Sequence, residues 1–555
     1  MAKQDKLVVG LLAAAASLLA FLYYYRHGSL LLYGDAVAHI NIARRVFDSL
    51  TPGPREFGTV WLPLPHVLIL PFVIPLGWWQ SGVGGSIYAM AAYVLGAAGI
   101  FRLAFRLTAS RAAAWVAFLV FAGNPNLLYM QATAMTESLY LALFIWATVY
   151  FADYVEESRS GDEDAYRRAT RAITRCGWCV AGMVLTRYDG WFVGPFFVGA
   201  AIVVLFRRRG TKFLTQRDAP LWRGVRNMAV ISAAAPVFWL VYNWALNGHP
   251  LDFALGPYSA KAIEERTSTP GVFHPGHHDL GMAWTFFRKC AELTLTDSTW
   301  HHALFYAAIV GVVLGLIFHR RSWPGLFLWL PWPFYALSIA YGSIPLFMPV
   351  WWPFTYYNVR YGLQLLPAIA LGVAGLYAAP GYRRFRYSVP ADDPSATRKL
   401  QVITLLPRIA LAVYLIVIAA IYVTAWRATP ITLREAEVNS RARLALESEM
   451  AKELQALPAD ATLLMFIGEH GGALQRAGIP LRRTINETTH RHGELPNGLW
   501  ERALADPARY ADYAVAFGGD AVAQSAAQHS ADLTPLVVVH TAGQPPATIY
   551  RVHRR

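Results

Sequence analysis

Acidic and basic side chains that could do chemistry appear directly after long apolar runs in this 555-residue chain. The first example is LLYGDAVAHINIARR, residues 31–45, which follows the run LVVGLLAAAASLLAFLYYY. Its Asp35 and His39 are four residues apart, so a helix would place both on one face. A charged group beside lipid is costly and tends to mark function. Asp35 could therefore act as a general base, or it could only cap the start of a helix.

Further residues of similar chemistry occur later in the chain. They are His66 in GTVWLPLPH, Glu137 in TESLYLALF, Arg187 and Asp189 in LTRYDGWF, Lys261 in NGHPLDFALGPYSAKA, and Arg360 and Tyr361 in YYNVRYGLQLLPAIAL. Structural roles are open to them too, because the helix dipole favours an acid in a first turn and an arginine can anchor a helix at a membrane interface. The stretch HPGHHD, 274–279, lacks the spacing of a zinc site. A divalent metal is therefore not favoured, and we predict no cofactor.

The composition indicates which elements must position these residues. The chain is 55% hydrophobic and only 15% charged, whereas soluble domains are about 45–50% apolar with about a quarter of their residues charged. The net charge of +14 could suggest nucleic acid, but the basic residues cluster in short gaps between apolar runs, as in membrane proteins. We therefore predict a polytopic α-helical membrane protein that binds no nucleic acid.

About eleven apolar runs approach the roughly 20 residues that cross a bilayer. They lie at 7–26, 83–104, 112–130, 136–153, 171–187, 190–206, 226–246, 301–319, 325–343, 361–379 and 405–426. The segment 63–79 is apolar but broken by prolines, so we expect an interfacial or re-entrant piece rather than a span.

Arginine placement predicts the orientation of these spans. If the N-terminus is cytoplasmic, the inner loops are all basic; they are 102–111, 154–175, 207–226, 319–322 and 380–404. Three regions then lie outside: a first loop, 27–82, with Asp35; a second loop, 247–300; and the tail after about 427. The candidate acids and bases thus converge on one membrane face, which we expect to be the outer face of the plasma (inner) membrane.

The tail differs from the rest of the chain. LREAEVNSRARLALESEMAKELQAL reads as an amphipathic helix. Short strand-like runs follow, namely ATLLMFIG, YAVAFGG and LTPLVVVHT, with polar stretches between them. We predict a transmembrane module at 1–427 and a small extracytoplasmic α/β domain at 428–555, which is a normal domain size.

Over residues 7–430 the order of these motifs resembles the GT-C superfamily of membrane glycosyltransferases. Within it, the chain is most similar to protein O-mannosyltransferases and lipid A aminoarabinose transferases, through the acid after span one, WLPLPH behind it, and RYGLQLLPAIAL opening a late span. The resemblance implies transfer of a sugar from a polyprenyl-phosphate donor on the outer face. It also implies that Asp35 is the catalytic acid of loop one and that RYGLQLLP lies near the donor phosphate.

Two departures from that pattern matter. Asp35 lies between Gly34 and Ala36, so the adjacent acids of metal-dependent members are missing. WLPLPH also lacks the lysine that the aminoarabinose group places before its prolines. A metal-dependent mechanism and donor contacts copied from that group are therefore not carried over.

The residues by themselves favour the same chemistry. Glycosyl transfer passes through an oxocarbenium-like state, a carboxylate can deprotonate the acceptor hydroxyl, and arginine suits a leaving phosphate. We predict inversion, with Asp35 as base and Arg360, Arg187, Tyr361 and Lys261 at the donor phosphate. Glu137, His39, His66 and Asp189 are further pocket candidates.

The expected partners are a polyprenyl-phosphate-linked sugar, membrane lipids, and a lipid, glycan or protein acceptor. Two alternatives stay open at this point. One is a lipid-linked glycan flippase or other transporter, although transporters more often hold polar groups near the membrane midplane. The other is a non-catalytic scaffold whose outer domain binds a partner.

Overall fold

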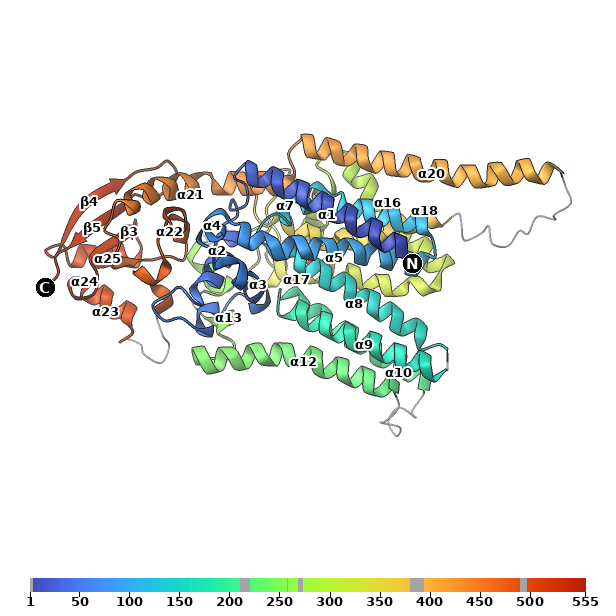
Figure 1. Ribbon diagram of the computed structural model, residues 1–555, viewed down its shortest axis with the longest axis horizontal. Helices are drawn as coiled ribbons and strands as arrows, with labels where there is room; N and C mark the ends of the chain where they lie inside the picture. The colour runs from blue at the N-terminus through green and yellow to red at the C-terminus, as the bar shows by residue number, and fades with distance from the viewer. Residues whose placement is uncertain are drawn as a thin grey trace.

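A long helical bundle carries a small mixed domain at one end; the C-terminus lies in that domain, and the N-terminus lies in the part of the bundle away from it (Figure 1). The computed structural model describes residues 3–160, 162–209, 220–256, 258–267, 273–379, 394–489 and 497–555. Part of the predicted inner loop 207–226 and most of 380–404 lie outside these described residues.

Among the described residues, eight helical segments are long and apolar enough to cross a membrane. They include α1 (Lys3–Arg26), α5 (Val83–Thr108), α8 (Glu137–Glu157), α10 (Asp189–Arg209), α12 (Pro220–Asn247), α16 (Trp300–Phe318), η4 (Val359–Leu365) with α18 (Leu366–Ala378), and α20 (Pro394–Arg427). Large apolar side chains on α12, such as Val230 and Trp244, are more than 60% exposed, as suits contact with lipid. The predicted polytopic membrane protein is confirmed.

Three of the predicted spans correspond to shorter or more polar elements. These are α6 (Arg111–Ala122) with α7 (Pro125–Met130), α9 (Glu163–Val184), and η3 (Arg320–Trp329) with α17 (Pro331–Tyr341). Asn124 ends the first of these helical runs, because its side chain accepts from the backbone N–H groups of Asn126 and Leu127 and so starts α7. The number of eleven spans therefore stays a prediction.

Short helices fill the first predicted outer loop. They are α2 (Gly34–Arg45), η1 (Pro54–Phe57), α3 (Pro63–Ile69), η2 (Leu70–Val73) and α4 (Leu76–Ser81). The prolines at 63, 71 and 75 divide the apolar segment 63–79 into pieces far too short to span. Arg44 of α2 donates to the carbonyls of Val73 (2.7 Å) and Ile74 (2.9 Å), which ties these pieces together.

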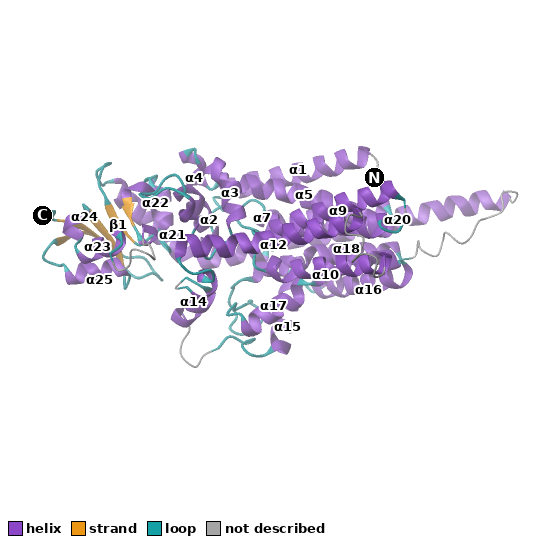
Figure 2. Ribbon diagram, turned by 90° about the horizontal axis from the view of Figure 1, so that it is seen from below, coloured by secondary structure: helices purple, strands orange, loops and turns teal. Residues whose placement is uncertain are grey.

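The second predicted outer loop also folds into helices, α13 (Asp252–Leu255), α14 (Ala260–Thr267) and α15 (Leu280–Leu295). Figure 2 shows α15 beside α17 at one side of the bundle. Cys290 of α15 donates to the carbonyl of Val359 at 2.9 Å. The loop thus packs against η4, the element that carries Arg360.

The C-terminal region is a small α/β domain, as predicted. Its elements are α21 (Ile431–Gln455), β1 (Leu463–Met465), α22 (Gly471–Ala477), η5 (Leu481–Arg483), β2 (Thr484–Ile485), η6 (Glu487–Thr489), α23 (Leu499–Ala505), α24 (Pro507–Tyr510), β3 (Tyr513–Phe517), α25 (Ala521–Gln528), β4 (Leu533–Val539) and β5 (Ala547–Val552). The strand order is β2-β1-β3-β5-β4. β1 runs parallel to β2 and β3, and β5 runs antiparallel to β3 and β4.

This domain rests on the loop that contains Asp35. Arg443 of α21 donates to the carbonyls of Leu31 (3.1 Å) and Leu32 (2.8 Å). Gln475 of α22 donates to the carbonyl of Trp79 at 2.5 Å. A Cβ added to Gly471 would lie 3.1 Å from Asn41 Nδ2, so the backbone of α22 approaches α2 closely.

Glu487 lies at this junction, close enough to Arg45 of α2 to interact with it electrostatically. Its surroundings predict that the stability of the fold depends on pH. Its Oε2 accepts from the N–H of Ile467 at 2.9 Å, and burial raises its pKa from 4.5 to about 7. Between these values the folded carboxyl holds a proton that the unfolded one has lost, so this group's stabilisation is full below 4.5 and is lost as the pH rises through 7.

We therefore expect the melting temperature of the wild type to fall between pH 5 and 7.5, relative to that of Glu487→Gln. Thermal unfolding of both proteins in detergent across this range measures the difference. Parallel curves would show that Glu487 does not titrate there.

Candidate functional site

A cavity of about 210 Å³ is lined in part by α2, which lies at the end of the bundle nearest the α/β domain (Figure 1). Its polar lining comes from segments far apart in the sequence: α2, the start of α8, the turn between α9 and α10, α17 and η4. The polar and aromatic lining residues are Asp35, His39, Trp61, Thr136, Glu137, Thr186, Arg187, Tyr188, Asp189, Phe334, Tyr335, Arg360 and Tyr361. Seven of the nine residues predicted from the sequence are among them.

Asp35 faces this cavity. Tyr33 occupies the N-cap position of α2, and Asp35 follows in the first turn. Its carboxylate is directed at Arg360, whose Nη2 donates to Asp35 Oδ2 at 2.5 Å. The Asp35 side chain is 41% exposed, so it remains open to a ligand. Asp35 therefore does more than cap a helix, because Tyr33 holds the N-cap position and the carboxylate binds Arg360 instead.

Arg360 is held among three carboxylates. Besides Asp35, its guanidinium lies 3.5 Å from Glu137 Oε1 and 3.5 Å from Glu435 Oε1. The side chain is only 9% exposed. Asn358 starts η4 with a left-handed φ of 59°, a conformation that asparagine tolerates better than most residues. This turn brings Arg360 back toward the cavity.

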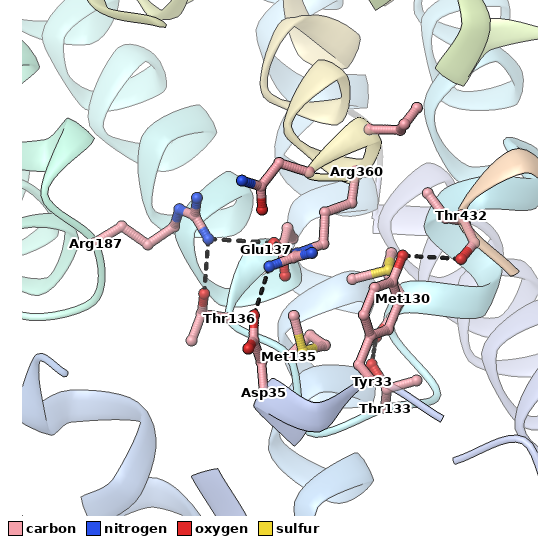
Figure 3. A network of polar contacts seen from close by, with 12 residues as sticks. Tyr33, Asp35, Met130, Thr133, Met135, Thr136, Glu137, Arg187, Arg360 and Thr432 are labelled. Atoms are coloured by element: carbon pink, nitrogen blue, oxygen red, sulfur yellow. Dashed lines mark hydrogen bonds and ion pairs between the residues drawn. The ribbon is translucent and has the colours of Figure 1, made fainter. Parts of the chain in front are cut away.

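Arg187 supplies a second cation on the same cavity wall. It donates to Thr136 Oγ1 at 2.9 Å, to Glu137 Oε1 at 3.2 Å and to the Tyr335 hydroxyl at 2.9 Å. Figure 3 shows Arg187 and Arg360 approaching Glu137 from two sides. Glu137 is completely buried, and the two arginines that contact it compensate its charge. The Tyr335 hydroxyl also donates to Asp189 Oδ2 at 3.1 Å.

Aromatic rings fix the two guanidinium groups. The Tyr361 ring lies 5.1 Å from the Cζ atoms of both Arg187 and Arg360, and the Tyr33 ring lies 4.9 Å from Arg360 Cζ. Such contacts are attractive, and more so where water is excluded. The two cations are thus preorganised about one tyrosine, and an anion in the cavity could reach both without rearranging the backbone.

Glu435 is a residue of this network that the sequence analysis missed. It comes from α21, the helix that leads into the α/β domain, and it is completely buried. Its carboxylate accepts from the backbone N–H groups of Val359 (3.3 Å) and Arg360 (3.2 Å) and from the Tyr33 hydroxyl (3.1 Å). Glu435 therefore positions the backbone of η4 as well as the Arg360 side chain. A signal for it would have been an acid one turn into a helix that follows the last span.

The structure places the remaining predicted residues as follows. His39 lines the cavity, and its Nδ1 lies 2.8 Å from Nε2 of His66, which is completely buried. Burial, together with His66 and the two arginines, lowers the pKa of His39 well below its usual value, so the ring is neutral. Lys261 lies elsewhere, with its side chain 70% exposed and its Nζ 4.0 Å from Glu265. The second predicted outer loop thus does not bring Lys261 to the described cavity.

A separate cluster could hold a metal ion. In the described part of the chain, ligand atoms of Glu292, His301 and His302 lie within 4.8 Å of one another. Lys289 Nζ already lies 2.9 Å from His301 Nε2 and 3.7 Å from Glu292 Oε2. A metal ion would have to displace this ammonium group. We therefore interpret the cluster as an ion-pair network.

No protein-family model matches the chain, and no curated protein matches it either. Solved structures do. ArnT from Cupriavidus metallidurans bound to undecaprenyl phosphate matches with a TM-score of 0.57 and 12% identity, covering 99% of both chains. Its apo state matches with a TM-score of 0.58 and 14% identity over 98% of both chains.

The chain has the fold of ArnT. The ArnT-like fold covers the bundle and the α/β domain together, because nearly all of both chains superimposes. An oligosaccharyltransferase from Archaeoglobus fulgidus, in complex with Zn and sulfate, matches with a TM-score of only 0.45 and 13% identity, over 92% of this chain and 68% of that one. The resemblance to GT-C proteins predicted from the motifs is confirmed at the level of the fold.

Proposed function

We propose that the protein is a membrane glycosyltransferase that moves a sugar from a polyprenyl-phosphate-linked donor to an acceptor hydroxyl. One observation carries the proposal: a partly exposed carboxylate, Asp35, pairs with the buried Arg360 in a cavity that a second, mostly covered arginine, Arg187, also lines. A base for a hydroxyl and a cationic site for a leaving phosphate are the two groups that this transfer needs. The ArnT-like fold supports the same assignment.

The proposed reaction is a single displacement. The acceptor hydroxyl loses its proton to Asp35, and its oxygen bonds to the anomeric carbon of the sugar. The bond from that carbon to the lipid phosphate breaks, and the electron pair stays on the phosphate oxygen. Arg360 and Arg187 stabilise the negative charge that develops there. The product therefore has inverted anomeric configuration.

The ion pair between Asp35 and Arg360 has a part in this scheme. Arg360 occupies one oxygen of the Asp35 carboxylate at 2.5 Å, so that oxygen is not free to contact an acceptor hydroxyl. A phosphate that accepts from Arg360 competes for the same N–H groups. Donor binding thus frees Asp35 for the acceptor. The donor must therefore bind before the acceptor is deprotonated, and Asp35 does not act as a base while the donor is absent.

An apolar groove supports a donor with a lipid tail. A second cavity of about 550 Å³ lies between α10 and η3, lined by Pro195, Phe196, Gly199, Ala200, Trp323, Leu326, Phe327 and Leu330. Asp189 of the polar cavity begins α10, six residues before Pro195. An isoprenoid chain would bury apolar surface there while its phosphate reaches the arginines.

The acceptor is a lipid, a glycan or a protein, and the reaction takes place on the outer face of the membrane with the N-terminus in the cytoplasm. The α/β domain contacts the loop of Asp35, and in this scheme it selects the acceptor. The scheme includes no metal cofactor, and Arg360 and Arg187 provide the cationic contacts to the phosphate.

A transfer assay with the purified protein tests the proposal. We expect labelled undecaprenyl-phospho-mannose or undecaprenyl-phospho-aminoarabinose to lose its sugar to a lipid or peptide acceptor fraction, with release of undecaprenyl phosphate. NMR of the product then gives the anomeric configuration. Retained configuration would exclude a single displacement, and an absence of transfer from every donor would favour a transporter or scaffold.

A further inference from the structure

Two buried histidines, His39 and His66, contact each other at the wall of the cavity. His39 lies on α2 one helical turn after Asp35, and His66 lies on α3. His39 Nδ1 and His66 Nε2 are 2.8 Å apart. His39 is 5% exposed and His66 is 0% exposed. Trp61 packs edge-on against the His39 ring, with centroids 4.1 Å apart, so the ring is held on more than one side.

The pair can hold its protons in two ways. A neutral imidazole has one N–H donor and one lone-pair acceptor. In the first arrangement His39 Nδ1 donates to His66 Nε2, which leaves His66 with an N–H at Nδ1. In the second, His66 Nε2 donates to His39 Nδ1, which leaves His66 Nδ1 a bare acceptor and puts the N–H of His39 at Nε2.

The surroundings of His66 select between them. His66 Nδ1 is buried and has no hydrogen-bond partner among the described residues. Among backbone groups, a buried N–H without an acceptor is rarer than an under-satisfied acceptor, and we apply the same preference to this imidazole. The second arrangement is therefore favoured, and His39 carries its proton at Nε2. This nitrogen has no protein partner within the described ranges, and its side chain lines the cavity.

We propose that His39 donates a hydrogen bond from Nε2 to an oxygen of the lipid-linked donor, and that His66 is the positioning residue that sets this tautomer. The inference rests on the proposed function, because it takes the cavity as the donor site. A neutral donor here adds specificity where two arginines already supply charge. The acceptor oxygen belongs either to the phosphate or to the sugar, and the choice of ligand distinguishes them.

Binding measurements test the role of His39 without turnover. Dissociation constants are measured for undecaprenyl phosphate and for undecaprenyl-phospho-mannose on the wild type, His39→Phe and His39→Gln. We expect His39→Phe to weaken binding about 10-fold and His39→Gln, whose amide keeps a donor, to weaken it less. A loss for both ligands places the bond at the phosphate, and a loss for the sugar-loaded lipid alone places it at the sugar.

A double-mutant cycle tests the role of His66. His66→Leu should weaken binding about as much as His39→Phe, and His66→Gln, which can still donate to Nδ1 of His39, should bind nearly as the wild type does. In the His39→Phe background, His66→Leu should have no further effect, because His66 acts through His39. A merely structural role would give the same loss in both backgrounds. Thermal unfolding checks that each variant is folded.

The outcomes separate this inference from the proposed function. If the wild type binds neither lipid, both fail. If the wild type binds and folded His39→Phe binds within twofold of it, only the inference is overturned. Should His66→Leu not fold, the comparison of His39→Phe with His39→Gln still decides whether His39 donates to the ligand.

Discussion

Asp35→Asn is expected to lower the rate of sugar transfer by about 10²–10⁴-fold, the usual contribution of a positioned general base. Asparagine keeps the shape of the side chain and an oxygen that can accept from Arg360, so the ion-pair geometry of the site is only weakly disturbed. The loss should appear in kcat with donor binding retained, because the base acts only on the acceptor proton. Single-turnover transfer from labelled donor measures it.

Undecaprenyl phosphate binding to the same variant is the control. Removing the Asp35 charge takes away a competitor for Arg360, so the lipid phosphate should bind as tightly as to the wild type or more tightly. Asp153→Asn is a matched variant at another partly buried acid, which pairs with Arg102 and Arg106, and it should leave the rate unchanged. Transfer by Asp35→Asn within a few-fold of the wild type would remove Asp35 from the role of base.

Arg360→Gln is expected to abolish phosphate binding and to destabilise the protein. The guanidinium is the common partner of Asp35, Glu137 and Glu435, of which the last two are completely buried. Removing one partner of a buried ion pair leaves an uncompensated charge, at a cost of about 3–5 kcal/mol. Thermal unfolding and undecaprenyl phosphate binding measure the two effects separately.

The double variant Arg360→Gln/Glu435→Gln separates them further. It removes both charges of one buried pair, so the melting temperature should recover relative to Arg360→Gln, while binding and transfer stay absent. Arg360→Lys should fold and keep part of the binding, because lysine retains the charge but not the planar fork. Full phosphate binding by folded Arg360→Gln would move the donor phosphate away from Arg360.

Local sequence patterns predicted the architecture, because whether a segment forms a membrane helix or a strand depends mainly on residues close together in the sequence. The apolar runs at 83–104 and 136–153 became α5 and α8 since helix length and lipid contact need only such a run. The strand-like runs YAVAFGG and LTPLVVVHT became β3 and β4. In α9 and η3, prolines or charges interrupt the apolar run. The extent of these helices depends on tertiary packing and could not be predicted from the run.

Individual site residues were harder to predict for a physical reason. Asp35, Glu137, Arg187 and Arg360 were recognisable because each lies beside an apolar run, on the membrane face that the arginine pattern predicts to be the outer one. Glu435 was not, since it lies in a polar helix where acids are common, and only the docking of α21 turns it inward. Lys261 was assigned to the same face, but its loop folds so that it pairs with Glu265 at the surface.

The sequence alone therefore determined the class of protein, eight of whose eleven predicted spans are long apolar helices, and the end of the bundle at which charged groups gather. It could do so because hydropathy and charge act on each segment separately. Only the tertiary structure decided that Asp35 meets Arg360, that Glu137 joins the two arginines, and that Glu435 reaches them from the C-terminal region. These contacts join residues up to 325 positions apart, and they follow from how whole helices pack, which no local pattern specifies.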